Sequence, residues 1–290
     1  MKLLKNKKTL MNSIPKILII FLVFSAISLK AQKTNELTLA VNGPVAVLGY
    51  NDIAYTAALD DGIGFGLEYG KYLSHQWSVR TGVALQTYSG NAKLKSIEGA
   101  YITQDSENES FEFQYRFENY REEQRTTYIQ IPLLAQYESN GQNRFFAAAG
   151  VKLGIITDSD YEAKATRLTT AGYYEQYDAL LEAPKFAGFG DFGNYTWEAD
   201  DLALKTNVML SFETGLKFLV SEVSSFYVSA YIDYGLTNVF DDTRDNRLIE
   251  YLAAPEVDFT GNSILTTPMG ATDTLKTLSF GFKLKYGLGF

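Results

Sequence analysis

The last thirteen residues of the chain, Leu278 to Phe290, have the sequence LSFGFKLKYGLGF. Large apolar residues alternate strictly there with small, polar or charged ones, the apolar set being Leu278, Phe280, Phe282, Leu284, Tyr286, Leu288 and Phe290. Because successive side chains of a β-strand point to opposite faces, a period of two predicts a strand with one apolar face. An apolar face that ends in an aromatic residue favours contact with lipid at a membrane boundary.

The same alternation recurs in seven further segments, at residues 36–50, 63–69, 77–86, 127–138, 145–155, 207–218 and 226–237. The first of these is the least regular, because Gly43 and Pro44 lie in its middle. The chain also has 20 Tyr and 19 Phe, a composition typical of strands. We therefore predict an all-β protein with eight strands.

The lengths of the connections indicate the architecture. Short connections at residues 74–76, 139–143 and 221–225 alternate with long ones at residues 51–61, 89–124, 158–201 and 241–276. Outer-membrane barrels have an even number of antiparallel strands, short periplasmic turns and long outer loops. The pattern predicts an eight-stranded antiparallel transmembrane β-barrel with short periplasmic turns, long extracellular loops and both ends of the barrel on the periplasmic side.

Composition excludes several other classes. The mean hydropathy of the 290-residue chain is −0.12, which is too polar for a bundle of membrane helices. The absence of Cys excludes disulfide scaffolds, thiolate zinc sites and cysteine nucleophiles. A single His removes most histidine metal sites and most Ser-His-Asp chemistry.

Residues 1–31 are predicted to be a secretory signal peptide. They contain six Lys and no acid, and their apolar stretch, residues 17–27, is broken only by Ser25. That stretch is too short for a membrane-spanning helix, which needs about 20 residues, so a retained anchor is the weaker alternative. We place cleavage after Ala31, with Met11 as an alternative start and residues 32–290 as the barrel domain.

Removing the signal peptide leaves 20 basic against 34 acidic residues, a net charge of −14. A surface of that sign repels polyanions, so a nucleic-acid partner is not expected. The predicted location is the outer membrane of a Gram-negative bacterium.

The second face of the strands carries four acids and five bases. They are Glu68, Arg80, Glu138, Lys152, Glu213, Lys217, Asp233, Lys283 and Lys285. In a soluble barrel of the lipocalin kind such a face would point to water, and its charges would need no balance. In a narrow membrane barrel the same face lines the interior, where buried charges require partners. The near balance favours the second arrangement, with a ladder of interior ion pairs.

One strand resembles a known family. The run YIQIPLLAQY, Tyr128 to Tyr137, resembles a strand of the Bacteroidetes outer-membrane β-barrel family, which includes PorT-like proteins. The segments Lys30–Gln32 and Gly287–Phe290 are similar to that family as well. The resemblance implies a small outer-membrane barrel of the porin-family type, and it implies no single activity. Within this strand we expect Pro132 to face inward at a β-bulge, because proline cannot donate to the ladder.

The long connections are rich in aromatic residues. In the second, Phe111, Phe113, Tyr115 and Phe117 alternate with polar residues, which predicts that the flanking strands continue above the membrane as a hairpin. The third is predicted to be a loop that contains Tyr173, Tyr174, Tyr177, Phe189, Phe192, Tyr195 and Trp197. The favoured interpretation is that such rings pack the loops over the barrel mouth. The alternative is that they offer a contact surface for a protein or a sugar.

No catalytic, cofactor or metal site is predicted. His75, the only histidine, falls in the shortest turn on the periplasmic side, away from the outer rim. Asp241, Asp242 and Asp245 offer carboxylates for calcium, but their spacing does not match a calcium loop, which favours a solvated turn. Glu213 and Asp233 would be the acids of an enzyme at the rim, yet nearby bases favour structural ion pairs.

The sequence thus predicts a non-enzymatic outer-membrane barrel with a structural, adhesion or assembly role through its extracellular loops. A narrow transport pore and a rim-located enzyme remain the alternatives. Expected partners are outer-membrane lipid, the barrel assembly machinery acting on the C-terminal strand that ends in Phe290, and an envelope protein or glycan bound by the loops. No cofactor is expected.

Overall fold

The computed structural model describes residues 34–50, 62–200, 202, 204–240, 246–254, 256–268 and 274–290. The predicted signal peptide, its cleavage site and the alternative start lie outside these ranges, as do Asp241, Asp242 and Asp245. Within the described ranges, no helix has the length and hydropathy needed to span a membrane.

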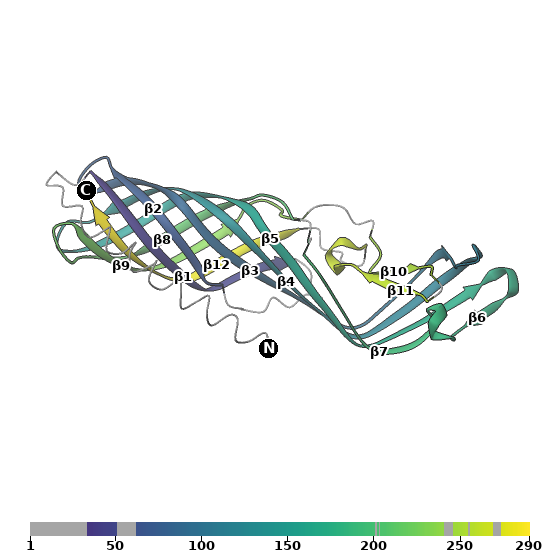
Figure 1. Ribbon diagram of the computed structural model, residues 1–290. Helices are drawn as coiled ribbons and strands as arrows, with labels where there is room; N and C mark the ends of the chain where they lie inside the picture. The colour runs from purple at the N-terminus through teal and green to yellow at the C-terminus, as the bar shows by residue number, and fades with distance from the viewer. Residues whose placement is uncertain are drawn as a thin grey trace, which may run out of the picture.

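Eight strands form a closed antiparallel ring (Figure 1). Each pairs with the next around the ring, and the last pairs with the first. In ring order they are β1 (Asn35–Tyr50), β2 (Gly64–Tyr72), β3 (Trp77–Gln104), β4 (Ser110–Glu138), β5 (Asn143–Tyr174), β8 (Asn207–Leu219), β9 (Ser224–Gly235) and β12 (Leu275–Gly289). The predicted eight-stranded barrel is confirmed.

The two ends of the barrel chain close the ring at the rim with the short turns. Asn35 and Phe290 exchange backbone hydrogen bonds, with N–O distances of 3.1 and 3.0 Å. The connections at residues 73–76, 139–142 and 220–223 are the short ones. This rim is the periplasmic one, because outer-membrane barrels keep their short turns on that side.

Side chains alternate between the barrel interior and its outer surface. Along β9, Tyr227 and Tyr231 are buried inside, while Val228 and Ile232 are exposed. The exposed set is large and apolar around the whole ring, with Phe282 being 69% exposed. Apolar side chains at that density suit a lipid-facing band and would be costly in water.

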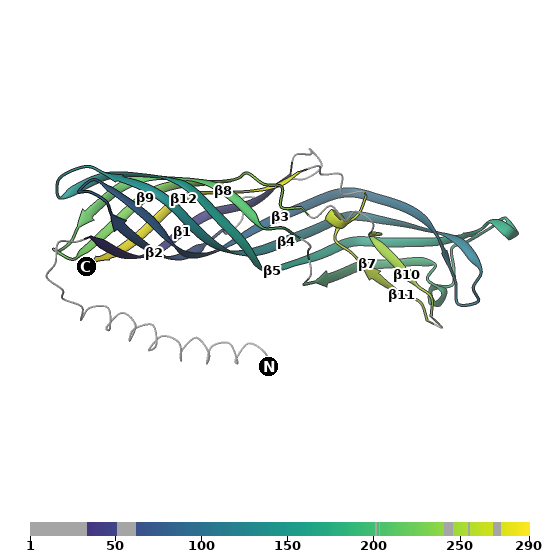
Figure 2. The ribbon, with the colours of Figure 1, turned by 90° about the horizontal axis from the view of Figure 1, so that it is seen from above.

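Strands β3, β4 and β5 extend far beyond the barrel. They contain 28, 29 and 32 residues, whereas about 10 suffice to span a bilayer. Figures 1 and 2 show their distal parts leaving the ring and bending away from the barrel. We call residues 91–124, 160–199 and 246–266 the extracellular extension. It also contains β6 (Ala179–Leu181), β7 (Gly190–Ala199), β10 (Ile249–Leu252), β11 (Asp258–Gly261), η1 (Glu175–Tyr177), η2 (Lys185–Ala187) and η3 (Ile264–Thr266).

The extension confirms one prediction and overturns another. The hairpin expected to continue from β3 into β4 is present. The third long connection is not a loop throughout, because β5 continues to Tyr174 and β7 pairs along it. Its pattern is weak in sequence because the buried face uses small residues, such as Ala163 and Ala165, while the other face meets water instead of lipid.

Pro132 faces the interior as predicted, but the predicted bulge is not there. Pairing with β3 is interrupted at residues 131 and 132 and resumes in the same register. The register shift between β4 and β5 lies instead between Thr127 and Tyr128. A proline removes only its own N–H from the ladder, so the strand tolerates it by omitting pairing to one neighbour without inserting a residue.

The bend between barrel and extension has a local cause at Asn119. Its φ of 50° is in the left-handed region, which asparagine tolerates better than most residues. The side-chain amide of Asn119 donates to Thr166 Oγ1 at 3.0 Å, and that hydroxyl donates to the Glu118 carbonyl at 3.0 Å. Glu118 and Asn119 separate the buried rings of Phe117 and Tyr120, so the inward face slips by one residue at the bend.

Candidate functional site

The barrel interior brings the charged residues predicted for the second face into contact with one another. Their ion pairs form three groups along the barrel, each between strands that are distant in sequence. A further acid, Glu36 on β1, joins them, so that five acids face five bases. Sequence reasoning missed Glu36 because Gly43 and Pro44 obscured that strand. The regular run Leu37, Leu39, Val41 would have placed Glu36 on the inner face.

The first group, the periplasmic-side network, is centred on Arg80 and Glu36, which form a short ion pair. Arg80 also lies 3.6 Å from Glu138, and Lys217 Nζ lies 3.2 Å from Glu36 and 3.1 Å from Glu138. The hydroxyl of Tyr72 donates to Glu138 at 2.7 Å. The charged side chains of this network are almost completely buried, and they tie together four strands and the end of β2.

The second group, the central network, is a square of two acids and two lysines. Lys283 and Lys285 are on β12, and their Nζ atoms lie 2.9 and 2.7 Å from Glu213 oxygens on β8. The same two lysines lie 3.7 and 3.5 Å from Glu68 on β2. Each carboxylate therefore serves two ammonium groups. The third group is a single pair, Lys152 with Asp233, at 2.7 Å.

Large side chains fill the interior above these pairs. Tyr88 and Tyr128 meet edge to face, with ring centroids 5.8 Å apart, and Met209 packs between strands beside them. Residues from the long connections and the first residue of β12 complete this cluster at the outer mouth, namely Leu202, Val239, Phe240, Leu265 and Leu275. An eight-stranded barrel has an interior just wide enough for side chains to fill, and this interior is filled by charged pairs below and by apolar groups above.

The extracellular extension has an aromatic core. Phe111 stacks on Tyr174 at 5.0 Å between centroids and meets Phe189 and Tyr251 edge to face at 5.5 and 5.1 Å. The β10–β11 hairpin supplies Tyr251 and Phe259 to this core. The structure therefore places most of the aromatic residues proposed as a contact surface inside the extension. Buried or packed against the core are Tyr174, Phe189, Phe192, Tyr195 and Trp197.

Of that proposed surface, Tyr177 remains the most accessible, at 61% exposed. Tyr173 is half-buried, and its hydroxyl donates to Asp178 at 3.0 Å. The far end of the extension adds apolar side chains that sequence reasoning did not single out, namely Ile102, Leu180, Leu181, Phe186 and Leu252. Together with Tyr177 they make up what we call the apolar tip. Strand alternation alone could not find it, because the six residues come from five separate elements, β3, η1, β6, η2 and β10.

One carboxyl group is buried in the extension with no basic partner among the described residues. Glu122 accepts hydrogen bonds from the Tyr120 hydroxyl, Gln124 Nε2 at 2.6 Å, Ser263 Oγ at 2.6 Å and the Ile264 backbone N–H at 2.8 Å. Burial raises the pKa of the Glu122 carboxyl above its ordinary value, and these hydrogen bonds oppose that rise. Glu122 thereby fastens the segment before η3 to β4.

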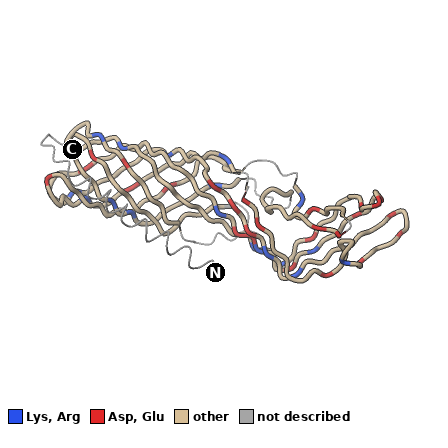
Figure 3. Tube along the Cα trace, in the orientation of Figure 1, with Lys and Arg blue, Asp and Glu red and all other residues tan. Residues whose placement is uncertain are grey.

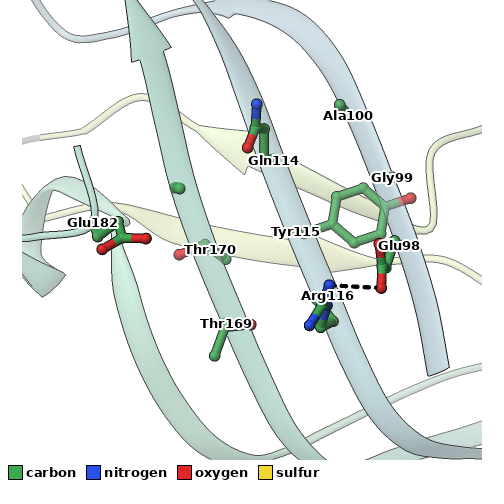
Figure 4. A pocket seen from close by; sticks show the side chains of 10 residues that line it. Glu98, Gly99, Ala100, Gln114, Tyr115, Arg116, Thr169, Thr170 and Glu182 are labelled. Atoms are coloured by element: carbon green, nitrogen blue, oxygen red, sulfur yellow. Dashed lines mark ion pairs between the residues drawn. The ribbon is translucent and has the colours of Figure 1, made fainter. Parts of the chain in front are cut away.

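A shallow groove of about 600 Å3 lies on the distal part of the extension (Figure 4). Glu98 and Arg116 form an ion pair of 2.8 Å on one side of it, and Glu182 lies on the other side. The Thr170 hydroxyl on its floor donates to the Gly188 carbonyl at 2.6 Å. The arginine of the groove, Arg116, is therefore paired, and the Thr170 hydroxyl is already bonded to a backbone carbonyl. Among its described lining residues, the groove does not hold a nucleophile in contact with a base.

Other candidate positions are placed as follows. His75 lies in the turn at the periplasmic rim, beside a cavity of about 680 Å3 that reaches Glu36 and Lys217. Glu213 and Asp233 are buried inside the barrel and engaged in ion pairs. Among the described residues, no group of three His, Cys, Asp or Glu side chains could hold a metal ion.

Comparisons with known proteins agree with this architecture. A family model described as outer membrane protein beta-barrel domain matches residues 58–241, well over half of the chain. No curated protein matches it. Similar solved structures include Neisserial surface protein A (10% identity, TM-score 0.34, covering 88% of this chain and 96% of that one). Others are OprG from Pseudomonas aeruginosa (12%, 0.33, 91% and 99%) and Ail of Yersinia pestis (11%, 0.28, 90% and 100%). At such TM-scores these likenesses add no argument to the family match.

Proposed function

Because the chain belongs to the outer membrane protein beta-barrel family, we propose that it is a non-enzymatic surface protein that acts through its extracellular extension. The role is structural, adhesive or in assembly, with an envelope protein or a glycan as the partner. The finer assignment to the Bacteroidetes, PorT-like branch rests on the Tyr128–Tyr137 motif. Export through residues 1–31 and insertion by the barrel assembly machinery acting on the strand ending in Phe290 belong to the same proposal.

The observation that carries the proposal is the contrast between a filled barrel and an ordered extension. A pore or an interior enzyme would need accessible space, whereas Arg80 and Lys285 are essentially fully buried in paired networks. The extension has its own aromatic core and holds its apolar tip away from the barrel. Exposed apolar residues on an ordered structure are typical of a contact site.

The test is co-purification from native outer membranes in mild detergent, with partners identified by mass spectrometry. We expect a stoichiometric partner with the wild-type protein that is lost from a tip variant, Tyr177→Ser/Leu180→Ser/Phe186→Ser. A matched control, Leu73→Ser/Val220→Ser, changes exposed residues at the opposite rim and should retain the partner. Purification of the wild-type protein alone, or equal retention by the tip variant, would count against the proposal.

The transport-pore alternative is tested separately in planar bilayers. The packed interior supports a closed barrel, so the proposal predicts no open-channel current. A steady single-channel conductance from the purified protein would favour the pore. A rim enzyme would instead lose an activity in Glu213→Gln or Asp233→Asn barrels that still assemble.

A further inference from the structure

The bend between barrel and extension carries a groove that is lined by bases and by no acid. Its volume is about 800 Å3, and its charged lining consists of Lys93, Lys95, Arg121 and Lys164. The remaining lining is mostly hydrogen-bonding side chains, Asn119, Thr166, Asn194 and Thr196 among them. In a chain with a net charge of −8, four bases around one groove favour an anionic ligand.

Three of these bases stand side by side across three strands. Lys93 on β3 is directly opposite Arg121 on β4, and Arg121 is directly opposite Lys164 on β5. All three are exposed. Like charges in direct cross-strand register destabilise a sheet, so this row is not explained by the stability of the extension.

Acidic neighbours neutralise the row only in part. Lys164 forms an ion pair with Glu162 at 2.7 Å. Among the described residues, Lys93, Lys95 and Arg121 form no ion pair. Figure 3 shows basic residues gathered where the strands bend. A ligand that brings several negative charges would relieve the repulsion along the row.

The row also faces the surrounding membrane instead of the barrel axis. Along β4 the lipid-facing residues are Ile129, Ile131 and Leu133, and the same alternation leads through Arg125 to Arg121. On β5, one extra residue is inserted where the register shifts beside Thr127. The lipid-facing side that includes Ile155 therefore continues, beyond the shift, as the side that includes Lys164. The groove therefore opens toward whatever surrounds the barrel just above the outer leaflet.

The height of the basic row above the apolar band of the barrel determines which part of an outer-leaflet lipid the groove can contact. Lys93 is eight residues beyond Leu85, the last exposed apolar residue of β3 in the barrel. At about 3.3 Å per residue and a strand tilt of roughly 40°, the row stands about 20 Å above the apolar band. That is beyond the headgroup layer of a phospholipid, which adds only about 5–8 Å per leaflet. It matches the saccharide core of an outer-leaflet glycolipid.

We propose that the groove of Lys93, Lys95, Arg121 and Lys164 binds the phosphorylated, acidic core saccharide of lipopolysaccharide in the surrounding outer leaflet. Lys93, Arg121 and Lys164 pair with phosphate or carboxylate oxygens of the core, while Asn119 and Thr196 donate to sugar hydroxyls. Bound glycolipid would brace the bend and fix the direction in which the extension points. The inference concerns a lipid contact and stands independently of any partner at the apolar tip.

The test measures binding of fluorescently labelled rough-form lipopolysaccharide, which carries lipid A and core, to the full-length mature protein in an uncharged detergent. The groove variant is Lys93→Gln/Arg121→Gln/Lys164→Gln. The matched control, Arg116→Gln/Arg167→Gln/Lys185→Gln, removes the same charge elsewhere on the extension. A base near an anionic surface contributes about fivefold in affinity, so the groove variant should bind roughly a hundredfold more weakly. The control should stay within about twofold.

Further arms identify the ligand. Lipid A without core, and rough-form lipopolysaccharide with the core phosphates removed, should both bind at least about fivefold more weakly than the intact glycolipid. Equal loss in the groove and control variants, full binding of core-free lipid A, or competition by inorganic phosphate at about 10 mM would each overturn the proposal. Tighter binding of heparin than of the glycolipid would assign the groove to a polysaccharide instead.

Folding is checked on the same samples. Both variants should keep the mobility difference between unboiled and boiled protein on a detergent gel. Removing like charges in register should leave the thermal midpoint of the groove variant unchanged or raised. A lowered midpoint would mean that the row serves stability, which contradicts the proposal.

Discussion

Strands β3, β4 and β5 contribute to both the barrel interior and the core of the extracellular extension, and they do so with opposite chemistry. Within the barrel, the inner face of β4 carries Gln130, Gln136 and Glu138, and in the extension it carries Phe111 and Phe113. The outer face changes in the reverse sense, from lipid-facing Leu133 to charged residues. Where lipid surrounds the strand, its inner face carries polar residues; where water surrounds it, its inner face carries aromatic residues.

The two regions consequently treat buried charge differently. Below its apolar cluster, the barrel interior is polar and buries acids and bases in balanced networks. The extension buries aromatic rings and admits one carboxyl, Glu122, that is satisfied by hydrogen bonds alone. Breaking a pair in the barrel should therefore cost at least as much as removing a ring from the extension, and both should exceed the loss of an exposed pair.

The largest effect is expected for Arg80→Met in the periplasmic-side network. The substitution leaves Glu36 with Lys217 as its remaining basic partner, and Glu138 with Lys217 and the partly exposed Arg144. Removing one partner of a buried pair costs about 3–5 kcal/mol. The measurement is the urea midpoint of the barrel in lipid vesicles, followed by its mobility shift on a detergent gel. A loss below about 1 kcal/mol would mean that the interior networks contribute to specificity rather than to stability.

The second effect is expected for Phe111→Ala in the extension core. Phe111 is 2% exposed and touches three other rings, and truncating a buried Phe costs about 3–5 kcal/mol. We expect the extension to become protease-sensitive in intact vesicles while the barrel keeps its gel mobility. If the barrel midpoint falls equally, the two regions unfold as one unit and the comparison fails.

The third effect is a pH dependence of the extension alone. The raised pKa of Glu122 means that the folded extension holds a proton more tightly than the unfolded chain. Stability from this group is therefore fully present below the unfolded pKa, near 4.5, and is lost as the pH rises through the folded pKa. The loss is about 1.4 kcal/mol for each unit by which folding raises the pKa.

The probe for this effect is Trp197 fluorescence in a Trp77→Phe background, since these are the two tryptophans of the chain. The urea midpoint of the extension should fall between pH 4.5 and 8 in the parent and stay level in Glu122→Gln. A slope that survives the Glu122→Gln substitution would assign the pH dependence to another group.

Sequence patterns were sufficient wherever lipid imposes a strict alternation. The eight barrel strands and the inner charges could be predicted, because lipid on one face admits only apolar residues. The extension is harder to predict because water on its outer face relaxes that rule, so the sequence pattern predicts a loop where β7 and the far part of β5 lie. Pairing partners such as Glu68 with Lys283 and Lys285 depend on barrel register, which no local pattern encodes.

For the aromatic residues of the third connection, too, the sequence was not sufficient. Composition located Tyr174, Phe189 and Trp197 in the right part of the chain. It could not tell whether they face solvent or a core, because that depends on the β10–β11 hairpin packing against them. The basic row at the bend was missed for a related reason, since Lys93, Arg121 and Lys164 become neighbours only through strand pairing.

The smallest effect is expected for Arg116→Met, and it completes the comparison with Arg80→Met. Arg116 and Glu98 form an ion pair of 2.8 Å, with side chains 55% and 59% exposed. Water screens the attraction between two exposed charges and solvates each charge when the pair is broken. The loss of this pair should therefore cost less than about 1 kcal/mol. The same urea measurement applies, now read from Trp197. Raising the salt concentration should weaken this pair further while leaving the Arg80 network unaffected, because only exposed charges are screened. If Arg116→Met costs as much as Arg80→Met, burial is not what distinguishes the two networks, and the extension must owe its stability to surface charge rather than to its aromatic core.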